Sequence, residues 1–73
     1  MSVARITEIS ATSEKSFEDA IQQGVARATS TLRNVSGCWV KEQQLKIKDN
    51  KIAEYQVNML ITFVLDEGAS DIA

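Results

Sequence analysis

The most regular pattern of apolar and polar residues lies in the C-terminal half of the chain. From Ala53 to Leu65 every second residue is apolar, and polar residues fill most of the positions between. Such a period of two predicts a strand with one fully apolar face. Asp49 and Asn50 stand before it and tolerate the positive φ angles of a type I′ turn. We therefore expect residues 38–48 and 51–65 to form a hairpin whose apolar face packs on a helix.

A different period marks the segment from Phe17 to Leu32. Its apolar and small residues recur at spacings of three and four, which is one stripe of a helix: Phe17, Ala20, Ile21, Gly24, Val25, Ala28 and Leu32. Ser16, with Asp19 three residues later, resembles a capping box at the helix start. Ala20, Gly24 and Ala28 form a ridge of small residues, which favours close packing of the helix on another backbone. We expect the helix to end near Leu32 or Arg33.

A first strand is predicted from Val3 to Ala11, where apolar residues fall on both faces, so both faces are expected to meet protein. The order is then β-α-β-β, an α+β fold with a three-stranded antiparallel sheet packed on one helix. Residues 1–66 are expected to form a single domain, and residues 67–73 a short polar tail that frays.

Length and composition indicate how so small a domain is stabilised. A chain of 73 residues buries only about 60% of its unfolded surface and needs disulfides, a metal or oligomerisation. One cysteine and no histidine exclude an internal disulfide and make a structural zinc site untenable. Oligomerisation remains as the expected remedy.

The net charge and the composition of individual segments limit the classes of partner that the protein is expected to bind. A net charge of -2 and a pI near 4.9 argue against a nucleic-acid partner, which would require a basic face. The N-terminus lacks the layout of a signal peptide, and no apolar run reaches transmembrane length. A free thiol without an export signal predicts a cytoplasmic protein, and no membrane partner is expected.

The only tryptophan, Trp39, is the main candidate for binding. With the hairpin turning at Asp49-Asn50, regular pairing places Trp39 opposite Leu60 and Gln43 opposite Gln56. The residues expected on the sheet face away from the helix are Gly37, Trp39, Gln43, Gln56, Leu60 and Thr62. Trp39 and Gln56 would lie roughly 13 Å apart along the strands, so one small ligand could contact both only across a symmetric interface.

A flat, polar-edged ring system suits these two residues. The indole of Trp39 supplies stacking, and the amide of Gln56 supplies a donor and an acceptor. The alternative is that Trp39 is an anchor at a subunit interface and Gln56 a solvated or cross-strand amide. Cys38 is interpreted as a small buried residue, because the chain has no histidine to activate a nucleophile.

Taken together, these residues resemble the dodecin family over nearly the whole chain. The similarity rests on the order and spacing of four motifs: Thr12-Ser13 leading into Ser16-Phe17-Glu18-Asp19-Ala20, Thr31-Leu32-Arg33-Asn34-Val35, Val40-Lys41-Glu42, and Glu54-Tyr55-Gln56-Val57. The resemblance implies a β-α-β-β protein that assembles into a hollow homododecamer. It also implies a protein that stores and buffers a flavin, riboflavin or FMN, and is not an enzyme.

The resemblance implies site residues that this sequence matches only in part. The family's flavin-contacting glutamine matches Gln56, whereas the family's stacking tryptophan falls at Gly37, two residues before Trp39. The shift keeps Trp39 on the same face, displaced by about 7 Å. Arginines that hold a phosphate or coenzyme A tail in some members would fall at Gln44 and Val64, which favours bare ring systems over phosphorylated ligands.

Two functions from different classes follow. The first is a flavoprotein shell, with Trp39 as a displaced stacking plate and Gln56 at the flavin edge. The second is a flavin-free dodecameric shell or scaffold, or a binder of another small molecule, in which Trp39 anchors the subunit interface. An enzyme is not expected, since paired catalytic acids, histidine and an activated nucleophile are lacking.

Overall fold

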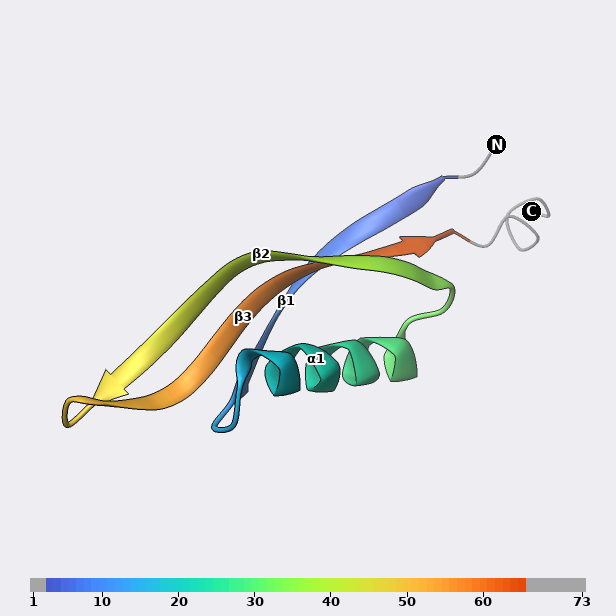
Figure 1. The fold of residues 1–73 in the computed structure, drawn as a ribbon. Coiled ribbons are helices and arrows are strands. Elements are labelled where there is room, and N and C mark those ends of the chain that lie inside the picture. The colour runs from blue at the N-terminus through green and yellow to red at the C-terminus, as the bar shows by residue number, and fades with distance from the viewer. Residues whose placement is uncertain (1–2, 66–73) are drawn as a thin grey trace.

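A computed structural model describes residues 3–65 of the chain and gives the expected order of elements (Figure 1). The elements are β1 (Ala4–Ser13), α1 (Phe17–Thr31), β2 (Val35–Lys48) and β3 (Lys51–Val64). The sheet is antiparallel with the order β1-β3-β2, so the β-α-β-β prediction is confirmed. β1 runs two residues further than expected, and the predicted tail at 67–73 lies outside the described residues.

The core lies between α1 and the alternating face of β3. Val57, Met59 and Ile61 are fully buried, and Val57 and Met59 cluster with Ala20 of the helix. The small-residue ridge explains how the helix comes so close, because a methyl group at Gly24 would collide with the Met59 side chain. The face of β3 predicted to lie on the helix is therefore the face that does.

The corner between β1 and α1 is held by hydrogen bonds that differ from the expected capping box. Ser16 caps the helix, since its hydroxyl accepts from the Asp19 N–H at 2.9 Å. The Asp19 carboxylate does not return to Ser16; it accepts from Ser13 Oγ and from Gln23 Nε2, each at 2.6 Å. Ser13 Oγ in turn accepts from the Lys15 N–H at 2.9 Å, so Asp19 ties the end of β1 to the first turn of α1.

This arrangement makes stability depend on pH through Asp19. The Ser13 hydrogen bond, assisted by Gln23 and Lys15 and opposed by desolvation, lowers the pKa of Asp19 below its ordinary value of 3.8. A lowered folded-state pKa contributes stability above pH 3.8 that is lost as the pH falls through the folded pKa. Asp19→Asn is therefore expected to unfold more readily than the wild type at pH 7, and the difference should shrink below about pH 4.

Thermal unfolding from pH 7 to pH 3 measures this difference. Glu18→Gln is the matched control, because it removes a charge from the same helical turn without breaking the Ser13 bond. A stability gap between Asp19→Asn and the wild type that is unchanged by acid would contradict the assignment.

The hairpin turns where expected, but its pairing is not uniform. Asp49 and Asn50 have φ angles of 55° and 62°, as a type I′ turn requires. Trp39 lies opposite Leu60 as predicted, whereas bulges between Lys46 and Ile47 and between Val40 and Glu42 shift the intervening register by one residue.

The shift between the bulges overturns the expected placement of Gln43. Gln44, not Gln43, lies opposite Gln56, and Gln43 lies opposite Val57 on the helix side. A bulge adds one residue to one strand and so reverses the facing of every residue up to the next bulge.

The described chain is elongated, because the β2–β3 hairpin extends far beyond the N-terminal end of α1 (Figure 1). Its extents are 56 × 19 × 14 Å and its radius of gyration is 15.3 Å, against about 11 Å for a compact domain of this length. Several large apolar side chains are left exposed: Val3, Ile6, Trp39, Val40, Leu45, Ile47, Ile52 and Leu65. The expectation that both faces of the first strand meet protein is wrong for the single chain, since Ile6 is 53% exposed.

Candidate ligand-binding face

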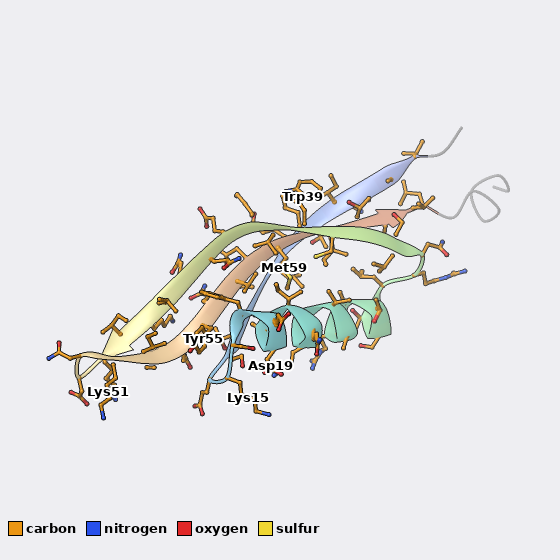
Figure 2. All side chains as sticks on the ribbon, in the orientation of Figure 1. Lys15, Asp19, Trp39, Lys51, Tyr55 and Met59 are labelled. Carbon is orange, nitrogen blue, oxygen red and sulfur yellow. The ribbon has the colours of Figure 1, made fainter. Side chains whose placement is uncertain are left out.

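Trp39 lies on the face of the sheet opposite to α1 (Figure 2). It stands beside Leu60 and is 49% exposed. Ile6 is on the same face, since its pairing partner is Thr62 of β3. A Cβ atom at Gly37 would meet nothing within 4 Å. The indole therefore stands on an apolar patch with open space on one side along its own strand.

Gln56 lies on the same face but within a polar row that crosses all three strands. Its Nε2 donates to Ser10 Oγ of β1 at 3.0 Å and to Asn58 Oδ1 at 3.4 Å. Asn58 Nδ2 donates to Glu42 Oε1 of β2 at 2.9 Å. The Gln56 amide is thus a cross-strand group, as the alternative interpretation expected, and it is also tied at its nitrogen.

The two sequence-predicted site residues are not brought into contact within one chain. Leu60, the partner of Trp39, is four residues from Gln56 along β3, which is roughly 13 Å. The face is one surface with an apolar end at Trp39 and a polar end at Gln56. A single ligand could contact both residues only where two copies of the face meet.

Two charged side chains near Trp39 form an ion pair across the sheet. Lys41 Nζ is 3.5 Å from Glu8 Oε1, and both side chains are about half exposed. Glu42 accepts from Asn58. The two positions at which the resemblance implies arginines in some relatives hold Gln44, opposite Gln56, and Val64, opposite Ala4. The face offers no guanidinium for a phosphate at either position.

Sequence reasoning missed three residues of the polar row: Ser10, Asn58 and Glu42. Ser10 and Asn58 could have been found from the sequence, because alternation along their strands places these polar residues on the same sheet face as Gln56. Glu42 could not have been found in this way, because it is the bulge at Lys41 that turns its side chain toward Asn58. A register drawn without that bulge faces Glu42 the other way.

Cys38 faces the helix side of the sheet, and its Sγ is 3.7 Å from Met59 Sδ. The residue is exposed, contrary to the expected buried position. Desolvation raises the pKa of its thiol, so the thiol stays protonated at neutral pH and is a poor nucleophile.

Among residues 3–65, no three side chains of His, Cys, Asp or Glu lie close enough to hold a metal ion. Within the same range, no helix has the length and apolarity needed to cross a membrane. A groove of about 410 Å³ lies between β1 and α1, lined in part by Ile9, Gly24, Arg27 and Leu32; it is on the other side of the sheet from Trp39.

Comparison with known proteins places the chain in one family. The Dodecin family model matches residues 3–66. A dodecin of Thermus thermophilus is 40% identical over 65 residues, which span 89% of this chain and 94% of that protein.

Solved structures agree with the sequence match. The dodecin from Streptomyces davaonensis superposes with a TM-score of 0.85 at 38% identity, covering 90% of this chain and 97% of that one. A calcium dodecin from Mycobacterium tuberculosis gives a TM-score of 0.76 at 26% identity, covering 88% and 91%. With a family model over nearly its whole length and a relative at 40% identity, this chain belongs to the dodecin family.

Proposed function

We propose that the chain assembles into a hollow homododecamer that binds a flavin between copies of the helix-free sheet face. Trp39 stacks on the flavin ring, and Gln56 of another copy contacts the ring edge. The protein stores and buffers the flavin in the cytoplasm and catalyses no reaction. The observation that carries this proposal is a half-exposed tryptophan beside open space, on the same face as a tethered glutamine.

The shape of the single chain supports the assembly. Among residues 3–65 five apolar side chains are buried, and a hairpin arm with exposed Leu45, Ile47 and Ile52 projects beyond the helix (Figure 1). Exposed apolar area of this kind marks interaction surfaces, and both β1 and β2 have free edges that need covering. A second copy of the chain supplies matching surface for both.

The chemistry of the face supports a ring system without a phosphate. Stacking on an indole and one amide contact are what a flat, polar-edged ring needs. Gln44 and Val64 replace the arginines that hold phosphate groups in some family members, and Lys41 is already paired with Glu8. We therefore propose riboflavin rather than FMN as the preferred flavin.

One observation favours the second candidate function, a flavin-free shell. Ile6, Trp39 and Leu60 lie on one sheet face, and Ile6 and Trp39 are about half exposed. Such apolar residues can seat the same residues of a second copy without a ligand. In that case Trp39 contributes to assembly instead of binding.

Mass and bound flavin can be measured on the same purified sample. Light scattering should give about 96 kDa for twelve chains of 8.0 kDa, and unfolding the protein should release flavin with its absorption bands. Titration should show tighter binding of riboflavin than of FMN. A monomeric mass would contradict the assembly. A dodecamer that neither carries nor takes up flavin would contradict flavin binding and favour the second candidate function, the flavin-free shell.

A further inference from the structure

The Gln56 amide is held in one orientation by a chain of hydrogen bonds that begins at a carboxylate. Glu42 Oε1 accepts from Asn58 Nδ2, Asn58 Oδ1 accepts from Gln56 Nε2, and Gln56 Nε2 also donates to Ser10 Oγ. The chain runs across all three strands on the face that carries Trp39. None of its members other than Gln56 has a role in the function proposed above.

Glu42 sets the direction of this chain because an ionised carboxylate can only accept hydrogen bonds. Asn58 must therefore turn its NH2 group toward Glu42, which leaves its carbonyl oxygen facing Gln56. Two amide oxygens facing one another would repel, so Gln56 turns its nitrogen toward Asn58. Ser10 can donate or accept and takes the remaining N–H.

The result is that both N–H groups of Gln56 are engaged within the chain, and its Oε1 is the atom left for a ligand. The sequence alone offered a donor and an acceptor at this position. In the structure only the acceptor, Oε1, is available to a ligand. Turning the amide round would cost the Asn58 bond or break the Asn58–Glu42 bond, which is charge-assisted and hence the stronger kind.

We propose that Glu42 and Asn58 are positioning residues that fix Gln56 with its oxygen toward the ligand, so that the site selects planar rings with an N–H donor on their edge. The ligand class rests on the proposed function; the orientation does not. For an oxidised flavin the ring has a single N–H, at N3, and this is the group that Gln56 Oε1 would accept from.

The test compares riboflavin with N3-methylriboflavin, which lacks that donor, by quenching of flavin fluorescence. The wild type should prefer riboflavin at least tenfold. In Glu42→Gln the preference should shrink about five- to tenfold, since a glutamine can donate as well as accept and no longer fixes Asn58. The steric cost of the methyl group is common to both proteins and cancels in this comparison.

Glu8→Gln is the matched control, because it removes a negative charge from the same sheet face, where Glu8 pairs with Lys41 and stands outside the hydrogen-bond chain of Gln56. It should keep the wild-type preference within twofold. An equal loss of preference in both variants would reduce the effect to general electrostatics and overturn the positioning role. An unchanged preference in Glu42→Gln would overturn it as well.

The orientation can be measured without any ligand by neutron diffraction from crystals exchanged into D2O. The deuterated nitrogen of Gln56 should point toward Asn58 and Ser10, and an oxygen in that place would overturn the inference. A protein that binds no riboflavin would refute the proposed function and the ligand class together, and the neutron map would still decide the orientation. Riboflavin binding without discrimination against the N3-methyl derivative would refute the ligand class alone.

Discussion

Trp39→Ala is expected to lower the affinity for riboflavin about 10- to 100-fold while the mass of the assembly stays unchanged. Stacking of a flat ring on an aromatic side chain contributes about 1–3 kcal/mol, and alanine removes the whole plate. The indole is 49% exposed in the single chain, so its removal opens no cavity in the core. Fluorescence titration gives the affinity, and light scattering on the same sample gives the mass.

Two variants make this result specific. Trp39→Phe keeps a smaller ring and should lose less affinity than Trp39→Ala. Val40→Ala removes apolar surface from the adjacent position, on the opposite face of the same strand, and should leave flavin binding near wild type. If Trp39→Ala dissociates the assembly instead, Trp39 is the interface anchor and the flavin-free shell becomes the better description.

A tryptophan introduced at Gly37 tests whether riboflavin binding lost in Trp39→Ala can be restored. A side chain at this position would start in open space, and the position shares its sheet face with Trp39. Adding Gly37→Trp to Trp39→Ala returns the stacking residue to the place it usually occupies in the family. Recovery of riboflavin affinity would mean that the two-residue shift moved the plate along the strand.

Ile47→Glu is expected to convert the assembly into monomers or small oligomers. Ile47 is 60% exposed near the tip of the hairpin arm, so in an isolated chain a charge there changes stability by no more than about 0.5 kcal/mol. If a neighbouring copy covers the arm, the same charge is buried without a partner and costs several kcal/mol at every interface. Size-exclusion chromatography with light scattering measures the change.

The control for this variant is Gln22→Glu, which adds the same charge to an exposed position of α1 away from its buried ridge of Ala20, Gly24 and Ala28. It should remain assembled. Circular dichroism should show that Ile47→Glu keeps its strands and helix. An Ile47→Glu protein that stays fully assembled would mean that the arm tip is solvated and that the interfaces lie elsewhere.

Local pattern predicted much of the fold correctly. The period-two alternation of β3, the small-residue ridge of α1 and the Asp49-Asn50 turn are each decided by residues close in sequence. The predicted pairing of Trp39 with Leu60 was right because the bulge at Lys46–Ile47 shifts the register by one residue and the bulge at Val40–Glu42 shifts it back. Between the bulges the prediction failed for Gln43, since a bulge depends on twist and packing that no residue pattern marks.

The candidate site was predictable in part for a related reason. Trp39 and Gln56 share a face because alternation along a strand is local, whereas the row from Ser10 through Asn58 to Glu42 depends on the register of three strands. The extent of the hairpin arm beyond α1 was also not predicted. The lengths of the helix and the strands follow from local patterns, but the position of the helix along the sheet is set by packing.

Titration of riboflavin with the assembled wild-type protein tests the central claim most directly. Flavin fluorescence should fall in proportion to added protein until the sites are filled, because a ring stacked on Trp39 is quenched, and the end point should correspond to a fixed ratio of flavin to chain. Riboflavin fluorescence that stays unchanged at a stoichiometric excess of assembled protein would contradict the account.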